Sequence, residues 1–206
     1  MDIINFKMVQ LIPFLLIYVV IAFLYYRNKK TSFIQQIIHL SFFIYVLLVI
    51  GNSLLPLPVS ERYIQMSIEQ GTEGKNNIIP FSDMFQIINN NSLNGIISQF
   101  VSNFNLLAPL GFYAPLIWRK FKNIKSIFFL GMIVSVGIAF TQFIISTIIN
   151  FTYRGFILDN IILNTIGVVI GFLILKLISP LLKKLAGQYD NQNEWVLNTR
   201  RDINEI

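Results

Sequence analysis

Five long stretches of this chain contain no charged residue, and they constrain its fold more than any other feature. They cover residues 8–26, 31–60, 84–118, 126–153 and 160–175. A helix that crosses a bilayer needs about 17–25 apolar residues. Only 13% of the residues are charged, whereas soluble domains carry about 25%. The sequence therefore predicts an all-α, polytopic membrane protein with about five transmembrane helices.

The expected helices fall within or close to these uncharged stretches. They span residues 8–26, 37–57, 96–118, 126–149 and 159–178. We expect the first to be a retained anchor, because the nearest basic cluster follows its apolar run, whereas a signal peptide has its basic residues in front. The chain then divides into two N-terminal anchor helices (1–57), an outer loop or interfacial segment (58–95), a three-helix core (96–180) and a cytoplasmic tail (181–206).

Lysine and arginine gather at alternate ends of the expected helices. Three clusters, within residues 27–30, 119–125 and 176–184, follow the first, third and fifth uncharged stretches. Because basic loops of membrane proteins stay on the cytoplasmic side, we expect a multi-pass protein of the cell membrane. Its N-terminus lies outside and its C-terminus in the cytoplasm. The net charge of +6 then needs no nucleic acid as a partner, since basic residues beside membranes attract anionic lipids.

Residue types that several kinds of chemistry require are missing from the sequence. The chain has no cysteine, which excludes disulfides, thiolate catalysis and cysteine-ligated zinc. His39 is the only histidine, and no metal site is expected around it. We find no phosphate-binding loop, nucleophile elbow or dinucleotide fingerprint, and we expect no cofactor.

Polar side chains share a face on each of the last three expected helices. The positions are Gln99 and Asn103, then Ser135, Gln142 and Ser146, then Asn160, Asn164, Gly167 and Gly171. Unpaired polar groups are costly in hydrocarbon, so such residues face the bundle interior or a water-filled pocket. For the last group, close helix packing is an alternative, because small residues at this spacing let two helices approach.

In the predicted topology these polar positions lie in the outer half of the bilayer, beneath Arg154 and Asp159 in a short outer loop. Arginine presents a fork of donors that suits phosphate or carboxylate. We therefore expect an outward-facing pocket for an anionic headgroup or a polar cell-surface molecule. As an alternative, Arg154 pairs with Asp159 or extends to lipid headgroups.

Several of these residues also follow the order and spacing of a known family. The matching elements are Asn77-Ile-Ile-Pro-Phe81, Asn103-Phe-Asn-Leu-Leu-Ala-Pro109-Leu-Gly111-Phe112, Gln142, Arg154 and Asn164-Thr-Ile-Gly167. Through them, residues 77–175 resemble the VanZ-like membrane proteins. The name-giving member of that family confers low-level resistance to the glycopeptide teicoplanin. Together with the expected pocket, the resemblance defines the candidate ligand-binding residues as Asn77, Asn103, Gln142, Arg154, Asp159, Asn160 and Asn164.

The chain departs from the family pattern at its acidic positions. The family usually has a glutamate three residues before the matching glutamine, where Ala139 stands here. In its Arg-x-x-Asp-x-x-Asp element, Arg154 is kept, but Ile157 and Asn160 occupy the acidic positions and Asp159 lies between them. Because a general base needs an ionisable group within reach of its proton, this loss favours binding over catalysis.

Three functions fit these features. The leading one is a non-enzymatic cell-envelope protein that binds a lipid-linked cell-wall precursor or a glycopeptide and contributes to teicoplanin-like resistance. The second is a membrane-embedded enzyme that acts on an anionic lipid headgroup, with Arg154 holding the anion and Asp159 as the base. The third is an accessory subunit in which the stripe of Asn160, Asn164, Gly167 and Gly171 contacts a membrane-protein partner or a second copy of the chain.

Overall fold

The computed structural model describes residues 3–4, 11–26, 33–89 and 93–188, and this part of the chain is mainly helical. Its helices are α1 (Leu11–Tyr26), α2 (Phe33–Leu54), α3 (Glu61–Glu69), α4 (Ser82–Asn89), α5 (Leu93–Ile117), the 3-10 helix η2 (Arg119–Phe121), α6 (Ile124–Ile148) and α7 (Leu158–Gln188). Two short strands, β1 (Ile3–Ile4) and β2 (Leu57–Pro58), pair antiparallel. The prediction of an all-α protein is confirmed for the described residues.

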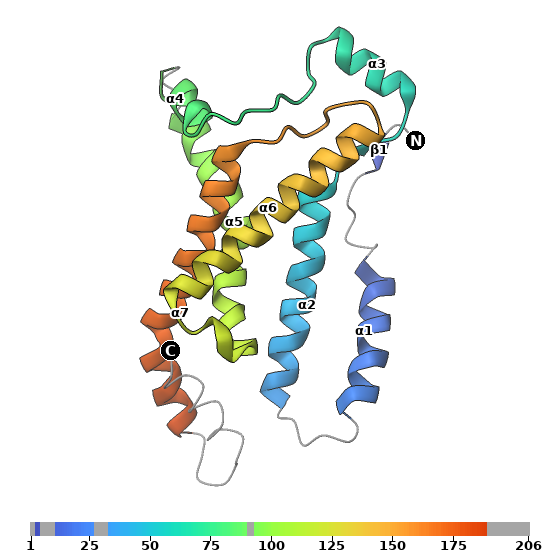
Figure 1. Ribbon diagram of the computed structural model, residues 1–206. Coiled ribbons are helices and arrows are strands. Elements are labelled where there is room, and N and C mark those ends of the chain that lie inside the picture. The colour runs from blue at the N-terminus through green and yellow to red at the C-terminus, as the bar shows by residue number, and fades with distance from the viewer. Residues whose placement is uncertain (1–2, 5–10, 27–32, 90–92, 189–206) are drawn as a thin grey trace.

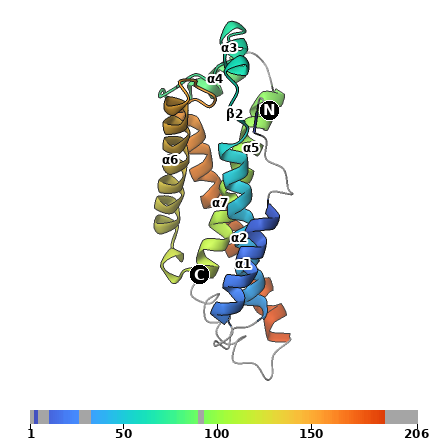
Figure 2. The same ribbon diagram turned by 90° about the vertical axis from the view of Figure 1, so that its right-hand side faces the viewer.

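The longer helices α1, α2, α5, α6 and α7 run up and down in alternation (Figure 1). Helix α5 lies beside α7, α6 packs on α7, and α2 contacts α5. Helix α1 lies next to α2 at the edge of the bundle (Figures 1 and 2). Helices α3 and α4 both lie at one end of the bundle, on its two sides, and the C-terminal end of α7 lies at the opposite end (Figure 1).

Three of the described helices are long and apolar enough to cross a membrane, by length and composition: Gln35–Leu54, Ile124–Ile148 and Leu158–Leu181. In α1 the apolar part is shorter, Ile12–Ala22. Helix α5 has 25 residues, but its first half carries Asn, Ser and Gln side chains that lower its hydropathy. The membrane class is therefore supported by three spans, and the crossings expected for α1 and α5 stay predictions.

The segment expected as an outer loop or interfacial segment, 58–95, contains helices. It holds α3, α4 and the first turn of α5, which begins at Leu93, three residues before the predicted start. Among residues 86–97, those that the structure describes belong to α4 and α5. The basic cluster at 27–30 and the tail from 189 onward lie outside the described residues.

Local sequence explains several helix ends. Asn123 caps α6, and its side chain accepts the backbone N–H of Ser126 at 2.8 Å, as expected for a good N-cap residue. Pro56 follows the end of α2, where it cannot continue a helix. Pro109 and Pro115 lie inside α5, which membrane helices tolerate because neighbouring groups satisfy the freed carbonyls.

Glycines form the contact between α5 and α7. A Cβ at Gly171 of α7 would lie 1.9 Å from the carbonyl oxygen of Ala108, and a Cβ at Gly111 of α5 would lie 1.8 Å from that of Val168. At Gly167 the corresponding distance is 3.2 Å, to the carbonyl oxygen of Phe104. Glycine therefore lets the two backbones touch. Close helix packing explains Gly167 and Gly171, the two glycines on the polar face of α7.

Candidate functional site

The loop between α6 and α7 is held in place by the segment that precedes α4. The backbone N–H of Asn77 donates to the carbonyl of Phe156 at 2.8 Å, and the N–H of Leu158 donates to the carbonyl of Asn77 at 2.9 Å. A Cβ at Gly155 would lie 1.9 Å from the carbonyl oxygen of Lys75. The close approach of these two backbone segments therefore requires glycine at this position. Asn77 thus fixes the loop through its backbone at Phe156, two residues after Arg154.

Arg154 turns its guanidinium toward the end of α2. It donates to the carbonyl oxygen of Leu55 at 2.8 Å, and its own carbonyl accepts the hydroxyl of Ser146 at 3.4 Å. Burial lowers the pKa of Arg154, and the neighbouring Tyr153 acts in the opposite direction. Since an arginine stays protonated in proteins, a positive charge is held at a partly buried position. No ion pair joins it to Asp159 in the described structure.

The Asp159 carboxylate is engaged by backbone amides at the start of α4. It is 1% exposed, and it accepts N–H groups of Phe81, of Asp83 at 3.1 Å and of Met84 at 3.3 Å. A carboxylate is stabilised there because the first amides of a helix lack partners and carry its positive dipole end. Phe81 adopts a φ of +63°, which is uncommon for a residue other than glycine. Asp159 therefore anchors α4 to α7.

Five of the seven candidate residues line a single cavity of about 70 Å³ beside this loop. Its wall comes from α2, α5, α6, α7 and the α6–α7 loop. The lining residues are Ser53, Asn103, Leu106, Ser135, Ile138, Ala139, Gln142, Arg154, Gly155, Ile157, Asn160, Ile161 and Asn164. Arg154 is the only charged residue among them. Ala139, Ile157 and Asn160, which stand where the family pattern has acidic residues, all belong to this lining.

Two polar atoms of the lining have no hydrogen-bond partner among the described protein groups. They are Oγ of Ser135, whose residue is 1% exposed, and Oδ1 of Asn164, whose residue is 5% exposed. Buried polar side chains in folded proteins are almost always paired with protein, water or ligand. Other lining amides are paired: Asn103 donates to Asn160 at 3.2 Å, and Gln142 donates to the carbonyl of Ser53 at 2.6 Å. The cavity thus keeps polar capacity for a further molecule.

The remaining candidates lie apart from the cavity lining. Asn77 donates its side-chain amide to Asp83 and accepts the N–H of Ile79 at 3.1 Å, and Asp159 binds α4 as described. The side chain of Gln99 lies outside the described residues. Conversely, the sequence prediction missed Ser53, because α2 was interpreted as a plain anchor. Nothing in the local sequence around Ser53 indicates that it faces Gln142.

We expect Asp159→Ala to release the start of α4. Each hydrogen bond to a charged acceptor contributes about 1.5–3 kcal/mol, so losing the acceptor of three amides should speed their exchange with solvent at least tenfold. Hydrogen exchange of the peptide containing residues 81–84, followed by mass spectrometry, measures this. Glu69→Ala, at an exposed acid of α3, serves as the control. Unchanged exchange in the Asp159 variant would contradict the anchoring role.

Apolar helices that enclose a polar cavity beside a buried arginine define a helical membrane protein with a candidate anion-binding site. The family model described as VanZ/LLP1 matches residues 42–179, which is more than half of the chain. The chain therefore belongs to the VanZ/LLP1 family, and the match takes in most of α2 together with all elements of the cavity. Searches of curated proteins and of solved structures gave no match.

Proposed function

We propose that this chain is a five-span protein of the cell membrane whose outward-facing cavity binds an anionic group. The ligand is a lipid-linked cell-wall precursor or a teicoplanin-like glycopeptide, and its binding contributes to resistance. The observation that carries this proposal is the cavity lining, in which Arg154 is the only charge and the buried hydroxyl of Ser135, which can donate to an anion, lacks a protein partner. Membership of the VanZ/LLP1 family supports the connection with resistance.

The charge at the two ends of the bundle supports the proposed orientation. Arg119, Lys120, Lys122 and Lys125 cluster around η2 and the start of α6. The loop with Arg154 follows the other end of α6. Because short basic loops remain in the cytoplasm, the cavity end faces outward, and α1 and α5 complete the five crossings. The N-terminus then lies outside and the C-terminus inside.

The size of the cavity limits what enters it. A cavity needs about 10–15 Å³ to admit one water molecule, so a volume of about 70 Å³ holds several waters or one small ionic group. A phosphate or carboxylate fits this size, and the guanidinium of Arg154 matches either by a two-pronged, charge-assisted hydrogen bond. The rest of a lipid-linked or antibiotic ligand therefore lies outside the cavity.

The alternative of a membrane-embedded enzyme depended on Asp159 as the general base. Its carboxylate accepts three backbone amides and is buried against α4, away from the cavity lining. A general base must reach the proton that it removes. Since the lining itself holds no carboxylate, the geometry supports binding over acid–base catalysis.

Drug susceptibility tests the function in cells. We expect deletion of the gene to lower the inhibitory concentration of teicoplanin, and we expect Arg154→Ala to restore less than half of the effect that the wild-type gene restores. Arg62→Ala, which removes an exposed charge from α3 at the same end of the molecule, is the matched control and should restore it fully. Equal complementation by both variants at equal membrane protein levels would refute the role of Arg154.

A further inference from the structure

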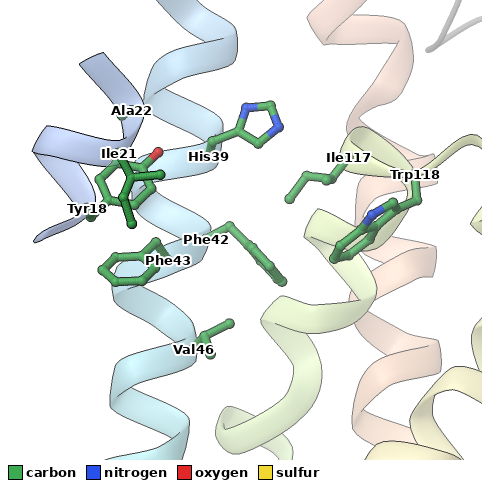
Figure 3. A pocket seen from close by; sticks show the side chains of 9 residues that line it. All are labelled: Tyr18, Ile21, Ala22, His39, Phe42, Phe43, Val46, Ile117 and Trp118. Carbon is green, nitrogen blue, oxygen red and sulfur yellow. The ribbon is translucent and has the colours of Figure 1, made fainter. Parts of the chain in front are cut away.

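A second, larger hollow lies at the opposite end of the bundle from the polar cavity. It is an apolar groove of about 500 Å³, a volume within the range of about 300–1,000 Å³ found for ligand sites. Its lining residues are Tyr18, Ile21, Ala22, His39, Phe42, Phe43, Val46, Ile117 and Trp118. Figure 3 shows these side chains converging from α1, α2 and the end of α5. We call this hollow the aromatic groove.

Ring contacts set the walls of the aromatic groove. On one side Tyr18 of α1 stacks on Phe43 of α2, with ring centroids 4.6 Å apart. On the other side Phe42 of α2 meets Trp118 edge-on at 5.4 Å. Such pairs fix the relative position of the helices beyond simple burial. The groove is therefore a defined gap between α1, α2 and α5, lined by the side chains that hold these helices together.

Basic residues come directly after one lining residue of the aromatic groove. Trp118, in its lining, is followed directly by Arg119 and Lys120, both exposed. The ammonium of Lys120 lies 4.8 Å from the ring centroid of Phe121, and that ring meets Trp118 edge-on at 6.0 Å. A tryptophan next to cations is typical of the level at which headgroups meet the hydrocarbon. The groove itself is apolar, and we call the two cations that follow its lining in the chain, Arg119 and Lys120, the rim.

We propose that the aromatic groove binds one anionic phospholipid, with an acyl chain between α1, α2 and α5 and the phosphate at Arg119 and Lys120. Basic pockets between membrane helices on the cytoplasmic side recognise such headgroups, and the charge of the rim selects an anionic over a zwitterionic lipid. The site is separate from the polar cavity. Along α5, Asn103 and Ile117 are 14 residues apart, about 21 Å at 1.5 Å per residue.

Quenching of Trp118 by brominated lipids tests this site in the full-length chain. The protein has two tryptophans, so Trp195→Phe leaves Trp118 as the only emitter. The protein is reconstituted into phosphatidylcholine that contains a small fraction of lipid brominated on its acyl chains, either phosphatidylglycerol or phosphatidylcholine. We expect brominated phosphatidylglycerol to bind next to Trp118 at least about fivefold more strongly, since each basic residue near a membrane contributes about 1 kcal/mol.

Variants distinguish lipid binding at the aromatic groove from general electrostatic attraction of anionic lipids to the protein. The double variant Arg119→Gln/Lys120→Gln should bring the preference for phosphatidylglycerol close to one, and Ala22→Leu, which fills the groove, should weaken quenching by the brominated anionic lipid. Lys125→Gln removes an exposed cation from α6, outside the groove lining, and should keep the fivefold preference. Equal quenching by the two brominated lipids overturns the proposal, as does an equal loss in Lys125→Gln and in the double variant Arg119→Gln/Lys120→Gln. Weak quenching by both lipids, as expected when a second copy of the chain covers the groove, also overturns it.

Discussion

Ala139→Glu is expected to weaken binding of a polyprenyl phosphate to the purified protein by about a hundredfold or more. Ala139 is 7% exposed and lines the polar cavity together with Arg154. A glutamate there brings a carboxylate into the space that the anion needs and offsets the charge of the guanidinium. At an effective dielectric constant of about 20, two unit charges 4 Å apart interact by about 4 kcal/mol, and each 1.4 kcal/mol is a tenfold change in affinity.

The matched control for this variant is Ala139→Gln, which has nearly the same size and no charge. We expect it to keep most of the affinity, so that the difference between the two variants isolates the charge. Binding is measured by thermal shift and by titration calorimetry in detergent, with polyprenol as the neutral counterpart of the lipid phosphate. A wild-type affinity in Ala139→Glu, or an equal loss in both variants, would contradict an electrostatic role of Arg154 in the cavity.

Gly171→Leu is expected to prevent stable folding or to lower the melting temperature by about 10 °C or more. Even a Cβ at this position would lie 1.9 Å from the carbonyl oxygen of Ala108, and backbone cannot move aside as a flexible side chain does. Separating α5 from α7 also disturbs the buried residues between them, Leu107, Val168 and Phe172. A loss above about 3 kcal/mol corresponds to roughly 10 °C for a chain of this size.

The control is Gly137→Leu on α6, where a Cβ would meet no atom within 4 Å. This variant should express and melt like the wild type, since the new side chain extends away from the bundle. Size-exclusion chromatography and the melting curve in detergent provide the measurement. Equal stability of the two variants would show that the α5–α7 contact does not depend on glycine.

Much of the candidate site followed from helical periodicity. Asn103, Gln142, Asn160 and Asn164 are polar residues in apolar helices, and the cost of burying them predicts that they face one another. The structure brings these four together with Arg154 around one cavity. Ser53 was missed because a lone serine near the end of an apolar helix carries no directional signal, and its neighbour Gln142 is 89 residues away in the chain.

By itself, the sequence determined the class of this protein, a helical membrane protein, because charge-free runs of membrane length are costly anywhere except in a bilayer. It also determined which residues are too polar to face lipid. Only the tertiary structure decided what these residues do. The sequence placed Asp159 in an outer loop near Arg154, yet its carboxylate accepts the backbone N–H of Phe81, 78 residues earlier in the chain. Such contacts depend on how distant backbone segments meet, and no local pattern of side chains encodes them.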